Sequence, residues 1–226
     1  MKNTITINNF SLIIITGVLG LIAAILVGIG EYLLHFDTLD RYNDGYSFML
    51  GIDDNRSTMG HFFGVFGATL YPVGCYHIYL MLRSANEKGA KLAFYLGFLG
   101  FMVGAVWIGS RSSISALIQH PEVGKLENLV QLYEQRYETL LSFVRITVFG
   151  LSGIFVWLCL TGKSFYPRWA AIFNPAALII LSFVIYLTAP DLGKHLMPIA
   201  LNVAFFLFFL MSLIHFYKYN LKTNNL

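Results

Sequence analysis

The sequence predicts an all-α polytopic membrane protein, a bundle of six transmembrane helices. Apolar residues make up 57 % of the 226 residues and charged residues only 12 %, about half the share in a soluble protein. The mean hydropathy is +0.65, and apolar runs of membrane-spanning length recur along the chain. A soluble enzyme, a disordered chain and a disulfide-stapled secreted module are therefore excluded. The net charge of +3 is too small and too dispersed for a nucleic-acid partner.

Six segments meet the length that a bilayer requires, roughly 20 mostly apolar residues. No internal repeat or linker divides the chain, so we expect residues 1–226 to form one helical domain. Pro72 is expected to kink or locally open the second segment. The spans are expected at residues 11–34, 59–82, 93–118, 140–160, 169–188 and 196–216.

Charge predicts the orientation of these spans. An even number of spans puts both termini on one side, and the short turns on that side, residues 83–91 and 163–168, are rich in Lys and Arg. All but one of the 12 acidic residues fall on the other side. Because basic short loops mark the cytoplasmic face, we expect a protein of the cell membrane with both termini in the cytoplasm.

The opposite face carries two longer connections. The first, residues 35–58, is rich in acidic residues. In an assembly subunit it would be a docking surface, and the alternative of an ion-binding surface stays open although the spacing of a calcium loop is absent. The second includes Tyr133 and Tyr137 among apolar residues at helical spacing, and we expect it to be an amphipathic extension of the fourth span. A helix from Val123 to Thr161 would be about 58 Å long. It would either project outward or bend near Glu138–Leu140 and lie at the surface.

Two ionisable residues fall at membrane depth, where such groups are costly and usually functional. Glu31 follows a stripe of small residues that ends at Gly28, so it either faces a neighbouring helix or reaches water near the helix end. Arg145 lies one to two turns inside the fourth span. It either extends to the outer interface or points inward to pair with Glu31, Glu138 or an anionic ligand, and the inward arrangement is favoured slightly.

The histidines do not form a recognised ligand motif. His61 and His77 are sixteen residues apart in the second span, about 24 Å along a helix, so they cannot share a metal. A haem would require two histidines at equal depth on different helices. His61 could meet His195 or His35, and His77 could equally well pair with His215. The sequence predicts no metal site and names no cofactor.

Together these residues predict a polar pocket that opens to the extracytoplasmic side. Acid, histidine and arginine at similar depth would supply a general base, a general acid and an anion clamp. The expected ligand is a lipid-like or amphipathic small molecule, although no motif specifies a reaction. The residues expected to act on it are Glu31, His61, Arg145 and His195, and those expected to bind it are Arg111, Glu138, Asp191 and Asn202.

Arg111 and Asn202 also have structural interpretations. Arg111 lies among serines in GSRSSIS, so it forms either the rim of an anion site or a helix end that frays into a polar loop, and the frayed end is favoured. Asn202 suits an interhelical hydrogen bond.

Two other functions remain open from sequence. A transporter or channel subunit would use the kinked second span and the intramembrane polar residues, although the lack of inverted repeats argues against a standard secondary transporter. A structural or assembly subunit would pack its glycine faces, Gly60–Gly64 and Gly100–Gly104, against partners or a second copy of the chain. Besides membrane lipids, a homo-oligomer is therefore an expected partner.

Three segments also resemble a bacterial family. The first span ends in Gly30 and Glu31 followed by a leucine pair, the second carries Gly74 and His77 in a Gly–x–x–His pattern, and Tyr166–Pro175 reads YPRWAAIFNP. This combination resembles an uncharacterised bacterial family of small integral membrane proteins. The resemblance implies a polytopic helical fold and implies no activity.

Overall fold

The computed structural model describes residues 7–39, 41–42, 45–120, 122–161 and 163–224. Every regular element within these residues is an α-helix or a 3-10 helix (η), and none is a strand, which confirms the predicted all-α class. In chain order the elements are α1 (Ile7–His35), η1 (Ser47–Gly51), α2 (Asp54–Ala68), α3 (Tyr71–Leu82), α4 (Glu87–Ile118), η2 (Val123–Leu126), α5 (Glu127–Leu160), η3 (Arg168–Phe173), α6 (Pro175–Thr188), α7 (Pro190–Leu196), η4 (Met197–Ile199) and α8 (Ala200–Asn224).

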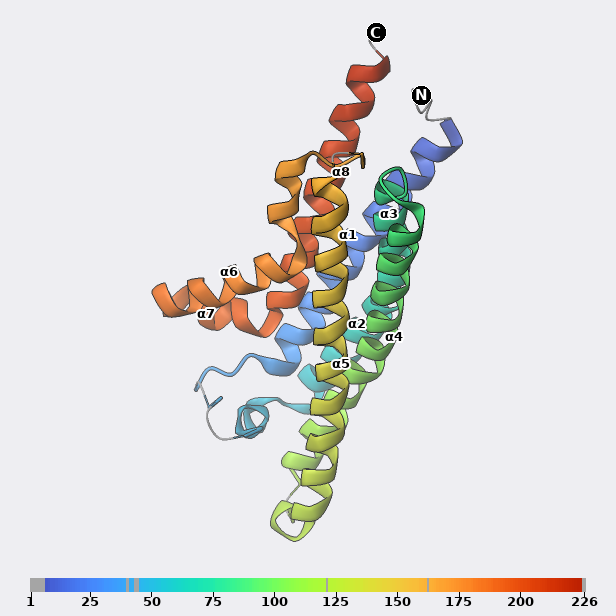
Figure 1. The fold of residues 1–226 in the computed structure, drawn as a ribbon. Helices are drawn as coiled ribbons and strands as arrows, with labels where there is room; N and C mark the ends of the chain where they lie inside the picture. Colours follow the sequence, from blue (N-terminus) through green and yellow to red (C-terminus); the bar gives the residue numbers. More distant parts are fainter. Residues whose placement is uncertain (1–6, 40, 43–44, 121, 162, 225–226) are drawn as a thin grey trace.

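Five helical stretches of the described chain are long and apolar enough to cross a membrane. They lie side by side in an elongated bundle, with both termini at the same end (Figure 1). This arrangement is compatible with the predicted membrane protein. The stretches are Phe10–His35, Asp54–Leu82, Glu87–Ile118, Val123–Leu160 and Pro190–Leu221.

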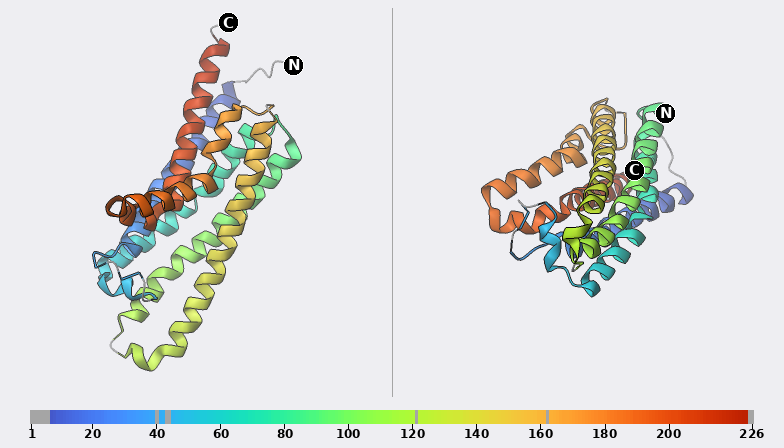
Figure 2. Two further views of the ribbon diagram at one scale, coloured as in Figure 1. Left: turned by 60° about the vertical axis from the view of Figure 1, so that its left-hand side comes forward. Right: turned by 90° about the horizontal axis from the view of Figure 1, so that it is seen from below.

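The predicted fifth span, residues 169–188, is where structure and prediction differ. Its first part is η3, and α6 has only 14 residues, fewer than the roughly 20 that a membrane requires. The ring of Pro175 disfavours helical backbone in Asn174, which is extended at φ −69° and ψ 150° and caps α6 by accepting a hydrogen bond from the backbone of Ala177. The six-span count is therefore not confirmed. Helix α6 runs outward from the bundle and α7 returns to it (Figure 2).

The predicted break at Pro72 is present. Helix α2 ends at Ala68, and Pro72 occupies the first turn of α3, so Thr69 and Leu70 separate the two helices. The break follows from chemistry, since proline lacks the N–H that would bond to the carbonyl one turn earlier. The two helices together make the second long stretch, Asp54–Leu82.

The amphipathic extension projects outward. Helix α5 is continuous over 34 residues, about 51 Å, and it has no break near Glu138–Leu140. With the end of α4 it forms a hairpin that extends beyond the other helices (Figures 1 and 2). Of the two predicted arrangements, the structure has the projecting one.

The glycine faces are packed inside the chain. A Cβ added to Gly30 of α1 would lie 2.5 Å from the backbone nitrogen of Gly64 in α2, so these two backbones are in direct contact. A Cβ added to Gly97 of α4 would lie 2.8 Å from Leu151 of α5. These faces hold one chain together, and the homo-oligomer stays a prediction.

The long outer connection lies only partly within the described residues, which leave out Asp40 and residues 43–44. In the described part, Arg41 donates hydrogen bonds to both carboxylate oxygens of Asp37, at 2.9 and 2.7 Å. These bonds lower the pKa of Asp37 to about 2. Tyr42 also donates to the His35 carbonyl, which ties the loop to the end of α1.

Candidate functional site

A cavity of about 590 Å³ lies between α1, α4, α5, α6 and the start of α8. This volume falls within the range of about 300–1,000 Å³ that is usual for small-molecule sites. The cavity reaches from Glu134 and Tyr46 to Phe149 and Ile179. It therefore occupies the half of the bundle away from both termini (Figure 1).

The polar end of the cavity is built around a buried ion pair. Arg111 of α4 and Glu31 of α1 are each only 3 % exposed, and Arg111 Nη1 lies 3.8 Å from Glu31 Oε1. Arg111 Nε donates a hydrogen bond of 2.7 Å to the hydroxyl of Tyr137. The guanidinium also lies over the Trp107 ring, 4.3 Å from its centre. A buried charge needs such partners, because isolating it from water is strongly unfavourable.

This ion pair belongs to a larger set of contacts, here called the outer polar network. Asn202 donates from Nδ2 to Glu31 Oε2 and accepts from the hydroxyl of Tyr71 at 2.6 Å. The network therefore runs from Tyr71 through Asn202, Glu31 and Arg111 to Tyr137. Each residue comes from a different helix, in the order α3, α8, α1, α4 and α5.

Three buried nitrogen atoms at this end have no hydrogen-bond partner among the described residues. They are Arg111 Nη1, Trp107 Nε1 and His35 Nδ1. All three residues line the cavity. A buried polar group without a partner costs about 1–3 kcal/mol, so a molecule with acceptor atoms would be bound favourably here.

The open flank of the cavity is charged and is formed by α5. Tyr46 donates to Glu138 Oε1 at 3.2 Å. Burial raises the pKa of the Tyr46 phenol above its ordinary value, so it stays protonated and can donate. Arg145 is exposed on the same helix and makes no ion pair with any described residue.

The other end of the cavity is mostly apolar, although the exposed Arg145 lies between Val144 and Val148 on α5. Val144 and Val148 of α5 form one wall, and Leu201 of α8 forms another. Helix α6 adds Ile179 and Phe183, so this short helix, which the sequence predicts as a span, serves as a side wall. The cavity thus combines charged and hydrogen-bonding groups at one end with hydrocarbon at the other.

Four of the predicted site residues line this cavity: Glu31, Arg111, Glu138 and Arg145. Asn202 joins them indirectly through its bond to Glu31. The buried partner of Glu31 is Arg111, whereas we favoured Arg145 for the inward position. Arg111 is also helical and buried, although we favoured a frayed helix end for it.

The remaining predicted residues lie elsewhere. His61 accompanies Ser112 at the contact of α2 and α4, with 3.1 Å between Nδ1 and Oγ. His195 is exposed and its Nδ1 lies 2.8 Å from the Tyr32 hydroxyl. Asp191 is exposed and lies 3.4 Å from Lys194. None of the three lines the cavity, and the described residues hold no group of three His, Cys, Asp or Glu suited to a metal.

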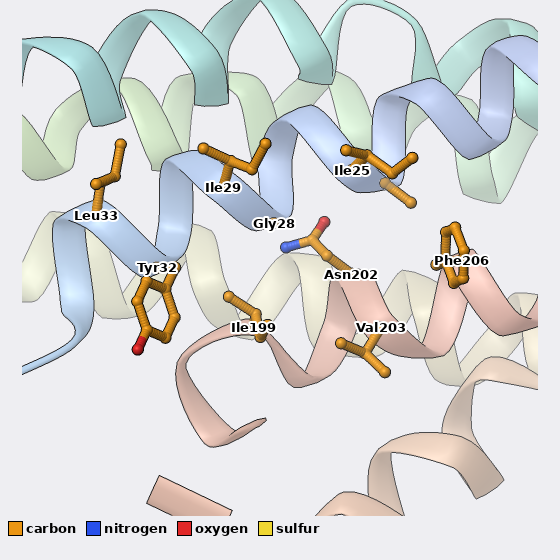
Figure 3. A pocket seen from close by; sticks show the side chains of 10 residues that line it. Ile25, Gly28, Ile29, Tyr32, Leu33, Ile199, Asn202, Val203 and Phe206 are labelled. Atoms are coloured by element: carbon orange, nitrogen blue, oxygen red, sulfur yellow. The ribbon is translucent and has the colours of Figure 1, made fainter. Parts of the chain in front are cut away.

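A second hollow, a groove of about 340 Å³, lies between α1 and α8. Asn202 points from α8 toward α1 beside Gly28, among apolar side chains that include Ile25 and Val203 (Figure 3). Tyr32 and Asn202 are its polar wall residues. Among the residues that line the groove, Asn202 alone belongs to the outer polar network. The groove therefore has far fewer polar groups to bind a ligand than the larger cavity has.

A second buried polar group, here called the inner polar cluster, lies nearer the termini. His77 Nε2 is 2.6 Å from Ser212 Oγ, and its Nδ1 is 2.9 Å from the carbonyl of Ile13. The Tyr166 hydroxyl lies 2.6 Å from the same Ser212 oxygen. His77 and Ser212 are completely buried.

Several cavity residues were not expected from the sequence. Trp107 precedes Arg111 by four residues, so helical spacing alone could have placed both on one face. Tyr137 was recognised only as an apolar position of the amphipathic stretch. His35 was considered only as a haem ligand, and Tyr46 lies in an irregular loop that gives no periodic signal.

Comparison with known proteins bears on the family but not on the activity. The model of a family of unknown function (DUF6796) matches residues 1–219. No curated protein and no solved structure matches the chain. The predicted resemblance to an uncharacterised family is thereby confirmed, and because the match covers nearly the whole sequence, the chain belongs to DUF6796, a family of unknown function.

Proposed function

We propose that this chain is an integral membrane protein that binds a lipid-like amphipathic molecule in the cavity beside α5 and α6. The single observation that carries the proposal is the two-ended lining of the cavity. Arg111, Trp107 and Glu31 form a buried polar end, and Val148 and Phe183 belong to the apolar end. An amphipathic molecule matches both ends at once, whereas a wholly polar or wholly apolar one matches only one.

We place this cavity in the extracytoplasmic half of the membrane. Both termini lie at the opposite end of the bundle (Figure 1), and the basic short turns predict that end to be cytoplasmic. The apolar end would then face the hydrocarbon core, and the polar end would lie near the outer interface. A membrane lipid could enter from the side, along the exposed face of α5.

Transport is less well supported. Asn202 of the outer polar network and Ser212 of the inner polar cluster are ten residues apart on α8, about 15 Å. Phe205 and Phe209, both with no exposed surface, lie between them on the same helix. A continuous polar path would have favoured a channel, and this aromatic layer interrupts it.

The test compares lipids that remain bound after purification from the host membrane. Leu141 lines the cavity, so Leu141→Trp should fill it. Leu187 is 77 % exposed on α6 and lies outside the cavity lining, so Leu187→Trp is the matched control. Native mass spectrometry of the detergent-solubilised proteins should show a bound lipid on the unmodified chain and on the control, but not on Leu141→Trp.

The opposite result is equally clear. If Leu141→Trp elutes as a folded protein and keeps the same bound lipid as the control, the lipid is held elsewhere and the proposed function is wrong. The helical circular dichroism and elution volume of the variant show whether it is folded.

A further inference from the structure

The unpaired nitrogens at the cavity restrict the polar group that can bind there. Trp107 Nε1 and Arg111 Nη1 can only donate hydrogen bonds. Both belong to α4, one turn apart, and the two residues are 6 % and 3 % exposed. The bound molecule must therefore bring acceptor oxygen atoms, and an ammonium group would leave both donors unpaired.

The charges around the cavity argue against an anionic acceptor. Arg111 already has a carboxylate, Glu31, within 3.8 Å. The whole lining carries three carboxylates, Glu31, Glu134 and Glu138, and two guanidinium groups, Arg111 and Arg145. A carboxylate or phosphate placed beside Arg111 would also lie near Glu31, and like charges repel strongly away from water. The unpaired N–H groups at the polar end therefore need hydrogen-bond acceptors, but the positive charge of Arg111 is already balanced by Glu31.

We propose, on the basis of the binding function above, that the polar group of the ligand is an uncharged carbonyl, as in a fatty-acyl ester, an amide or a long-chain quinone. A carbonyl oxygen has two lone pairs, so it can accept from both Arg111 Nη1 and Trp107 Nε1. Its hydrocarbon chain then extends toward Val148 and Phe183 at the apolar end. His35 Nδ1 is a further unpaired position for a second oxygen atom.

The test uses the fluorescence of Trp107 itself to report binding in the cavity. The chain has 3 tryptophans, and the other two, Trp157 and Trp169, are both 53 % exposed. Trp157→Phe with Trp169→Phe therefore leaves Trp107 as the only indole at little cost to the core. This variant is placed in lipid nanodiscs with a brominated probe, because bromine quenches indole fluorescence on contact. The probes are dibromostearic acid methyl ester, the dibromostearate anion at alkaline pH, and dibromo-octadecane.

The methyl ester should quench Trp107 at about tenfold lower mole fraction than the anion, and dibromo-octadecane should quench least. Unbrominated methyl stearate should restore the fluorescence. If the anion or the hydrocarbon quenches as well as the ester, the carbonyl proposal is overturned while binding in the cavity stands. If no probe gives saturable quenching that methyl stearate reverses, the proposed function itself is overturned.

Discussion

The outer polar network and the inner polar cluster are both buried, and both join α1, α3 and α8. They differ in how completely their polar atoms are paired. Both ring nitrogens of His77 in the inner cluster have partners. At the outer network, Arg111 Nη1, Trp107 Nε1 and His35 Nδ1 have none among the described residues, and the adjoining space is about 590 Å³.

The pairing in the inner cluster is balanced. A carbonyl can only accept, so His77 Nδ1 donates to Ile13 and its Nε2 accepts from Ser212 in the neutral ring. Burial raises the pKa of the Tyr166 phenol above its ordinary value, so that hydroxyl stays protonated and donates to Ser212. Buried polar residues on a long apolar helix are thus not by themselves a site. A surplus of donors beside open space is what distinguishes the outer network.

The largest effect is expected from breaking the ion pair of the outer network. Arg111→Met should lower the free energy of unfolding by about 3–5 kcal/mol, because it leaves Glu31 buried without a countercharge. Combining it with Glu31→Gln should restore most of that loss. Unfolding of the purified variants in mixed micelles measures both. Equal destabilisation in the single and the double variant would mean that the two charges do not compensate each other.

A smaller loss is expected in the inner cluster. His77→Leu removes two hydrogen bonds and leaves the buried Ser212 hydroxyl without its acceptor, His77 Nε2, which should cost about 2–4 kcal/mol in the same unfolding experiment. Lipid retention in native mass spectrometry should be unchanged, since His77 does not line the cavity. Loss of the bound lipid from a folded His77→Leu variant would contradict the separation between the two regions.

Local chemistry explains which parts of the fold the sequence could predict. Apolar length identified α1 and α4, and Pro72 identified the break between α2 and α3. The same hydropathy window misjudged residues 169–188, because it counts apolar side chains and ignores the conformational restriction that Pro175 places on Asn174. The short α6 that results is stabilised by packing against α7 and α8, which no local pattern reveals.

The candidate site was predictable in part for a similar reason. The cost of burying charge directed attention to Glu31 and Arg145, but the partner of Glu31 depends on how α4 is rotated against α1. The serines around Arg111 also led to a wrong prediction, because a run of serines is typical of a helix end that frays into a loop. In the structure Ser110 donates to the carbonyl of Trp107 at 2.7 Å and Ser112 to that of Gly109 at 3.3 Å. Ser110 therefore bonds within its own helix, whereas Ser112 also contacts α2, with 3.1 Å between its Oγ and His61 Nδ1.

The most specific test compares the two regions by removing one hydrogen-bond donor from each and keeping the aromatic ring that carries it. Tyr166→Phe removes a donor that is paired with Ser212, so the free energy of unfolding should fall by about 1 kcal/mol. Benzothienylalanine at Trp107 keeps the indole shape but lacks the unpaired N–H. It should leave the free energy of unfolding unchanged or raise it by up to about 1 kcal/mol in lipid-free micelles. Equal losses at the two positions would show that the indole N–H is already paired, and the outer network would then be closed in the same way as the inner cluster.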